Sequence, residues 1–115
     1  MPTQSDRLLV VWTSGDKEVA KKMVFMYTRN SMIHGWWPNV TLLVWGPSAQ
    51  LVINDVEIQD ELKLVQEAGV TVIACKSCAE KYEIVPKLET LGIDVFYTGE
   101  FITNWIKSGD HLITF

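Results

Sequence analysis

The two cysteines of the chain, Cys75 and Cys78, are the residues best suited to chemistry, and they lie three positions apart. They follow residues 70–74, a short apolar and β-branched run that is typical of a strand buried on both faces. Cys75 is therefore expected at the carboxyl end of this strand. Ser77 and Glu80 form a capping-box pattern, which predicts a helix with Ser77 as its N-cap and Cys78 in its first turn.

This placement favours the thiolate form of both cysteines. Each thiol would face the positive end of the helix dipole, and Lys76 stands between them. A single cysteine here would more often be core packing, but a pair with this spacing also matches the close approach that a disulfide needs. We expect Cys75 to be the more nucleophilic thiol, because it would face the crevice at the strand tip while Cys78 packs against the helix and the sheet. We also expect the pair to be able to close a disulfide.

Composition limits the partners of the protein. A length of 115 residues suits one domain, residues 1–115, with a core of its own. The net charge of −4 and the pI near 5.0 argue against nucleic acid and against an anionic membrane surface as partners. Hydrophobic residues make up 48% of the chain, and the adjacent Trp36 and Trp37 cannot both enter one core from one extended stretch. We therefore expect a homo-oligomer with a buried subunit interface.

The start of the chain indicates a cytoplasmic protein. Residues 1–7 are polar, and the apolar run that follows is shorter than the core of a secretory signal. No apolar run reaches the length of a membrane span. In a reducing compartment, a close cysteine pair favours a catalytic, redox or metal-binding role over a structural disulfide.

Predicted strands and helices alternate along the chain. Such alternation implies right-handed crossovers and a parallel sheet with helices on both faces. Three tryptophans, Trp12, Trp45 and Trp105, fall within element patterns and are expected in the core. The expected strands are residues 8–12, 40–45, 70–74, 93–97 and 111–115. The expected helices are residues 17–34, 49–54, 58–68, a short helix from 78, 86–91 and 100–108.

Ligands of parallel sheets gather outside the carboxyl ends of the strands. Four such ends are expected, at residues 13–16, 46–48, 75–78 and 97–100. The first offers hydroxyl groups and a helix N-terminus to an anion, but it lacks the G-x-G-x-x-G spacing of a dinucleotide site. We therefore expect no nucleotide or flavin cofactor. The weaker candidates for anion or ligand binding at these ends are Ser14, Gly15, Ser48, Lys76, Ser77 and Thr98.

The motifs at these strand ends also resemble a known family. The chain contains T-S-G-D after the first strand, G-P-S after the second, then G-V-T-V-I-A-C-x-x-C-A, and it closes with K-S-G-D-H-L-I-T-F. This layout is similar to that of the DsrE family of small sulfur-relay proteins. The resemblance implies a flavodoxin-like three-layer sandwich with a five-stranded parallel sheet, a trimer or hexamer, and sulfur-donor and acceptor proteins as partners. It assigns a persulfide-carrying role to Cys75, and Cys78 fits the C-x-x-C-A variant of a subset of relatives.

Other chemistries have weaker support. A zinc site within one chain would need His34 and His111 beside the cysteines, but both histidines are expected at the amino end of the sheet, roughly 16 Å away, so no metal is expected there. A site shared between subunits stays open. Thioredoxin-like chemistry lacks the later X-Pro loop of that fold, and serine hydrolysis lacks a G-x-S-x-G elbow.

Three function classes stay open. The first is a sulfur carrier or sulfurtransferase that holds sulfane sulfur on Cys75. The second is a thiol redox protein that cycles a disulfide between Cys75 and Cys78. The third is a non-catalytic assembly or small-ligand module whose cysteines are incidental.

Overall fold

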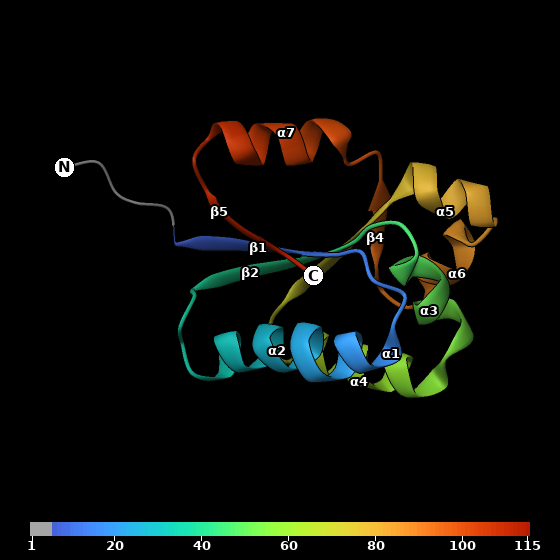
Figure 1. The fold of residues 1–115 in the computed structure, drawn as a ribbon, viewed down its shortest axis with the longest axis horizontal. Helices are drawn as coiled ribbons and strands as arrows, with labels where there is room; N and C mark the ends of the chain where they lie inside the picture. Colours follow the sequence, from blue (N-terminus) through green and yellow to red (C-terminus); the bar gives the residue numbers. More distant parts are fainter. Residues whose placement is uncertain (1–5) are drawn as a thin grey trace.

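The computed structural model describes residues 6–115, which form a five-stranded parallel sheet with helices on both sides (Figure 1). The α/β class and the five parallel strands agree with the prediction from the sequence. The strand order is β4-β3-β2-β1-β5. The strands are β1 (Arg7–Trp12), β2 (Asn39–Val44), β3 (Thr71–Cys75), β4 (Asp94–Phe96) and β5 (His111–Thr114).

One continuous helical stretch follows β1 and contains a π-helical turn. It consists of α1 (Lys17–Val19), η1 (Ala20–Phe25) and α2 (Met26–Ile33). Asp16 caps its start, since the carboxylate accepts hydrogen bonds from two backbone N–H groups of the first turn. The remaining helices are α3 (Ser48–Asn54), α4 (Val56–Glu67), α5 (Lys76–Tyr82), α6 (Val85–Thr90) and α7 (Gly99–Lys107). None of the helices in residues 6–115 is both long enough and apolar enough to cross a membrane.

Strand order explains why α7 lies apart from the other helices. The first three crossovers each lead to the neighbouring strand in the same direction, whereas the connection from β4 to β5 runs back across the sheet. Because parallel crossovers are right-handed, this reversal puts α7 on the opposite face. Figure 1 shows α1, α2 and α4 on one side of the sheet and α7 on the other.

Alternate residues of the strands fill two separate cores. Leu8, Val10 and Trp12 of β1 belong to the larger core, on the side of α2 and α4. Leu9 and Val11 belong to a smaller core that includes Trp105 of α7. The strands β1, β2 and β3 are thus buried on both faces, as their continuous apolar runs predict.

The expected core position of Trp45 is wrong. Trp12 and Trp105 are buried, but 39% of Trp45 is exposed. The reason is that β2 ends at Val44, so Trp45 already begins the turn at Gly46, whose φ of 83° allows the chain to reverse.

Candidate functional site

Cys75 belongs to a strand and a helix at the same time. It is the last ladder residue of β3, where it pairs with Phe96, and it is also the N-cap residue of α5 with extended backbone angles. The expected N-cap, Ser77, is therefore wrong, because the strand passes directly into a helix that begins at Lys76. No side chain caps this helix, and Cys78 is its third residue.

The relative burial of the two cysteines is the reverse of the expectation. Cys75 is only 7% exposed, whereas Cys78 is partly exposed. The cause is the alternation along β3, which places Cys75 on the same sheet face as Ile73, the face that α7 covers. Both cysteines are free thiols.

Hydrogen-bond donors converge on the sulfur of Cys75. Burial opposes ionisation of this thiol, but the backbone N–H of Cys78, the hydroxyl of Thr98, the thiol of Cys78 and the backbone N–H of Ser77 all stabilise the thiolate. These donors outweigh burial and hold the pKa of Cys75 below its ordinary value. The donors come from two chain segments, the turn into α5 and the turn after β4.

Cys78 is affected in the opposite sense. Burial raises the pKa of Cys78, and so does the hydrogen bond that its thiol gives to Cys75. The backbone N–H of Gly46 and the charge of Lys81 oppose this rise without cancelling it. Cys75 therefore ionises first, which agrees with the expectation that it is the more nucleophilic thiol; its reactivity stays a prediction.

Tyr97, Lys76 and Glu80 form a polar group, and Lys76 of this group follows Cys75 directly in the chain. The hydroxyl of Tyr97 donates a 2.9 Å hydrogen bond to the Glu80 carboxylate, and this bond raises the pKa of Tyr97. The ammonium of Lys76 lies 5.3 Å from the centre of the Tyr97 ring. Tyr97 is 59% exposed, so the group faces solvent at the rim of the site.

The other ligand candidates hold the strand-end turns in place. Buried Ser48 donates a 2.6 Å hydrogen bond to the carbonyl of Trp12, which joins the turn after β2 to the end of β1. The hydroxyl of Ser14 accepts a hydrogen bond from the N–H of Asp16. A Cβ at Gly15 would lie 3.4 Å from Pro47, so the turns after β1 and β2 are packed against each other.

Among residues 6–115, no three histidine, cysteine, aspartate or glutamate side chains form a group that could hold a metal ion. His34 stacks on Trp36, with ring centres 5.2 Å apart. His111 begins β5 opposite Leu8, and its ring lies 5.1 Å from that of Trp37.

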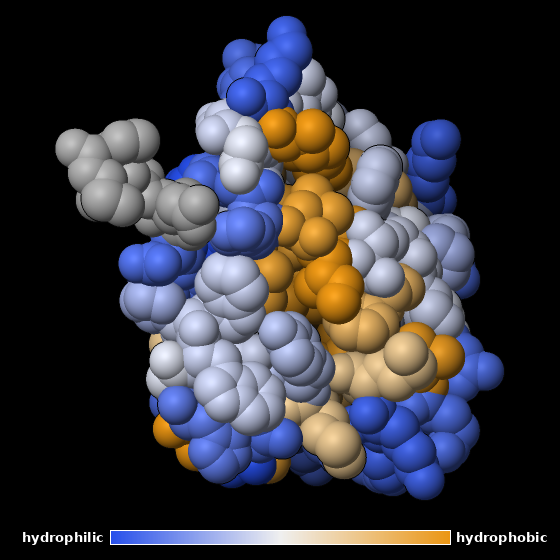
Figure 2. Space-filling view, turned by 60° about the vertical axis from the view of Figure 1, so that its left-hand side comes forward, coloured by the Kyte–Doolittle hydropathy of each residue, from blue (hydrophilic) through white to orange (hydrophobic). Residues whose placement is uncertain are grey.

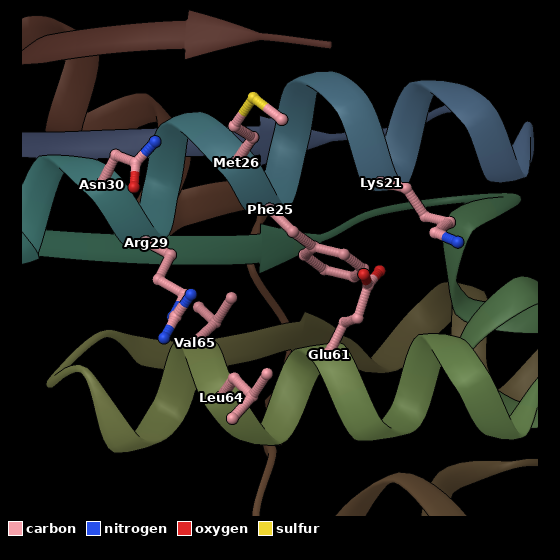
Figure 3. Close-up of a pocket in the computed structure, with 8 residues that line it drawn as sticks. All are labelled: Lys21, Phe25, Met26, Arg29, Asn30, Glu61, Leu64 and Val65. Atoms are coloured by element: carbon pink, nitrogen blue, oxygen red, sulfur yellow. The ribbon is translucent and has the colours of Figure 1, made fainter.

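A cavity that the sequence did not predict lies between the first helical stretch and α4. Its volume is about 310 Å³, and Phe25 and Glu61 point toward each other across it (Figure 3). The sequence gives no signal for it, because its charged members occupy positions that are typical of solvent-exposed helix faces. The lining residues are Lys21, Phe25, Met26, Arg29, Asn30, Glu61, Leu64 and Val65, none of which belongs to the cysteine turn.

Comparisons with known proteins agree on one family and one fold. The chain matches the DsrE/DsrF-like family over residues 13–115. It is 34% identical to BT1422, a conserved protein of unknown function from Bacteroides thetaiotaomicron, over 96% of this chain and 95% of that chain, with a TM-score of 0.93. No curated protein sequence matches the chain.

Two further solved structures share the fold at lower identity. MTH1491 from Methanobacterium thermoautotrophicum, also of unknown function, is 19% identical over 94% of this chain and 97% of that chain, with a TM-score of 0.77. The ychN protein from E. coli is 18% identical over 98% of this chain and 100% of that chain, with a TM-score of 0.66.

Proposed function

Because the chain belongs to the DsrE/DsrF-like family, a family associated with sulfur relay, we propose that it carries sulfane sulfur as a persulfide on Cys75. The observation that supports this most directly is the set of donors around Cys75, which lowers its pKa in spite of burial. A thiolate, not a thiol, attacks sulfane sulfur. The site thus favours the reactive form of Cys75.

The proposed transfer consists of two displacements. In the first, the Cys75 thiolate attacks the outer sulfur of a donor persulfide, a new S–S bond forms, and the donor leaves as its own thiolate. In the second, an acceptor thiolate attacks the outer sulfur on Cys75, and the Cys75 thiolate leaves. The two steps need no external oxidant or reductant. Donor and acceptor proteins are therefore the proposed partners, in the reducing cytoplasm where both cysteines stay available.

Treatment with sodium polysulfide followed by peptide mass analysis tests this proposal. We expect one added sulfur atom on Cys75 in the wild type and in Cys78→Ser, and none at this site in Cys75→Ser. Transfer of that sulfur to a small acceptor thiol completes the test. A wild-type protein that takes up no sulfur on Cys75 would contradict the proposal.

A second candidate is thiol–disulfide exchange, and the hydrogen bond between the two thiols favours it. Here the Cys75 thiolate attacks the disulfide of a partner, and Cys78 then displaces the partner to close an internal disulfide. The two functions differ in what Cys78→Ser retains. Sulfur carriage survives that substitution, whereas disulfide cycling is lost. A protein that supports neither reaction would instead be a non-catalytic module.

We also propose that the chain assembles with copies of itself, as a trimer or hexamer by analogy with the family. An apolar groove of about 400 Å³ runs between the first helical stretch and the edge strand β5. Met23, Met26, Trp36 and Ile113 are large exposed apolar residues in it. Figure 2 shows that apolar side chains also form a continuous band on one face of the molecule. Among residues 6–115, β5 pairs with no strand beyond β1, and an apolar groove beside such a sheet edge suits a second copy as its occupant.

A further inference from the structure

Thr98 carries a buried hydroxyl that the fold leaves without a partner. The residue lies two positions after the end of β4 and is only 1% exposed, and its Oγ1 makes no hydrogen bond among the described residues. Three other side chains in residues 6–115 share this property, those of Trp12, Thr28 and Glu61, but Thr98 is the one that contacts a cysteine. Buried polar groups are rarely left unpaired in native proteins, so this hydroxyl requires an explanation.

Helix capping does not explain it. Thr98 occupies the N-cap position of α7, where a threonine hydroxyl normally accepts a hydrogen bond from the first turn. Its backbone is helical instead, with φ −95° and ψ −2°, and no side-chain capping bond forms. The carbonyl of Thr98 accepts the N–H of Ile102 in the usual way. The Thr98 hydroxyl therefore does not make the capping hydrogen bond that is usual at an N-cap position.

The sheet brings this hydroxyl to Cys75. Residue 75 pairs with Phe96 across β3 and β4, so Thr98 lies two residues beyond that pair at the same edge of the sheet. After β3 the chain continues into α5, which packs on the larger core. After β4 it continues into α7, which packs on the smaller core, on the opposite face of the sheet. Where the connections after two adjacent parallel strands go to opposite faces of the sheet, a crevice forms at their carboxyl ends, and α/β proteins bind ligands there.

The acceptor that the Thr98 hydroxyl lacks is supplied when Cys75 ionises. In that state the hydroxyl donates to the sulfur from the β4 side, and the N–H groups of Ser77 and Cys78 donate from the α5 side. A neutral thiol attracts these donors far less than an anion does. The arrangement resembles an oxyanion hole built for sulfur.

We infer that Thr98 completes an anion hole for the sulfur of Cys75, and that this hole serves Cys75 above all as a leaving group. The second part rests on the proposed sulfur transfer. When an acceptor thiolate takes the outer sulfur, the S–S bond to Cys75 breaks and its electron pair stays on the Cys75 sulfur. The charge then arrives where the three donors point, and a better stabilised thiolate leaves faster.

The test compares Thr98→Val, which keeps the shape but removes the hydroxyl, with Thr98→Ser, which keeps the hydroxyl. Alkylation of Cys75 by iodoacetamide is followed across pH by peptide mass analysis. In Thr98→Val the midpoint should move to higher pH, and the thiolate population below it should fall about tenfold, the effect of one hydrogen bond to a charged group. Thr98→Ser should stay close to the wild type. Thr103→Val is the matched control, because its hydroxyl bonds only to the carbonyl of Gly99 on the exposed side of α7.

Two results would overturn the inference. One is a wild-type alkylation profile in a folded Thr98→Val. The other is an equal shift in Thr98→Val and Thr98→Ser, which would show that packing and not the hydroxyl matters. If Thr98→Val does not fold, the comparison of Thr98→Ser with Thr98→Ala decides in the same way, since both lose the methyl group.

A second readout separates this inference from the proposed function. With Cys75 already loaded with sulfur, release to a small thiol should slow about tenfold in Thr98→Val and remain near wild type in Thr98→Ser. If Cys75 never takes up sulfur while the alkylation shift appears, the proposed function fails and the anion hole stands. If sulfur loads and leaves normally with no alkylation shift, the function stands and the role of Thr98 fails.

Discussion

The thiol of Cys78 is placed to donate a hydrogen bond to the thiolate of Cys75, which lowers the pKa of Cys75 and raises that of Cys78. Ionisation of Cys75 strengthens this bond and makes Cys78 harder to ionise. One cysteine is thus prepared for attack while the other keeps its proton.

Removal of the Cys78 thiol should weaken Cys75 as an acid. Cys78→Ala deletes a donor, so the pKa of Cys75 should rise and its alkylation rate near neutral pH should fall by about tenfold. Cys78→Ser keeps an O–H donor and should retain most of the wild-type rate. The pH profile of Cys75 alkylation measures both. A faster rate in Cys78→Ala would mean that Cys78 shields Cys75 instead of supporting it.

Mild oxidation should close a disulfide between Cys75 and Cys78 without unfolding. The Cys78 thiol is placed to donate a hydrogen bond to Cys75, and the two residues lie three apart at the strand-to-helix turn. Mass analysis of peptides under non-reducing conditions detects the bond, and circular dichroism follows the fold. Disulfides formed only between separate chains would show that the sulfurs cannot meet within one chain.

The stability that Cys75 contributes should grow with pH. Its pKa in the folded state is lower than the ordinary value of 9.0 that it regains on unfolding. A group of this kind adds nothing below its folded pKa, and its contribution increases as the pH rises from there toward the unfolded value. The difference in unfolding free energy between the wild type and Cys75→Ser should therefore widen as the pH of the urea titrations is raised from neutral toward the ordinary value of 9.0. A constant difference over this range would refute the predicted shift.

Ser48 should be a structural residue more than a ligand. Ser48→Ala removes the buried hydrogen bond to the Trp12 carbonyl and should lower the unfolding free energy by about 1 kcal/mol. The exposed Ser108, which bonds to Asn104 within the last turn of its helix, gives the control, and Ser108→Ala should have a smaller effect. Denaturant unfolding of both variants gives the comparison.

The apolar groove should hold the assembly together. Met26→Asp and Ile113→Asp place a charge in it and should convert the oligomer to a monomer at micromolar concentration. Val56→Asp is the control, because Val56 is equally apolar and more exposed but lies outside the groove. Light scattering reports the mass. A wild-type monomer at micromolar concentration would remove the assembly proposal.

The sequence predicts the elements of this fold well because its signals are local. Continuous apolar runs identify β1 to β3, and the position of Cys75 at a strand tip follows from them. The strand order is not local, so the sequence alone could not assign α7 to the opposite face or place Thr98 against Cys75. The burial of Cys75 was missed for the same reason, because its cover belongs to a segment that returns from β4.

The sequence places the start of α5 two residues too late, for a different reason. Ser77 and Glu80 satisfy the capping pattern, but the pairing of Cys75 with Phe96 keeps the strand extended up to the first helical residue. Tertiary pairing therefore overrides a local capping preference.

The pairing of β3 with β4 also determines when, during folding, the pKa of Cys75 reaches its native value. The hydroxyl of Thr98 reaches Cys75 only once these two strands are paired, so a chain in which β4 has not docked lacks one of the donors that lower the pKa of Cys75. If Cys75 carries sulfur as proposed, a newly synthesised molecule is a poorer target for sulfur donors until its β4 segment has docked. Under the proposed function, full reactivity of Cys75 toward a sulfur donor therefore belongs to the completed domain.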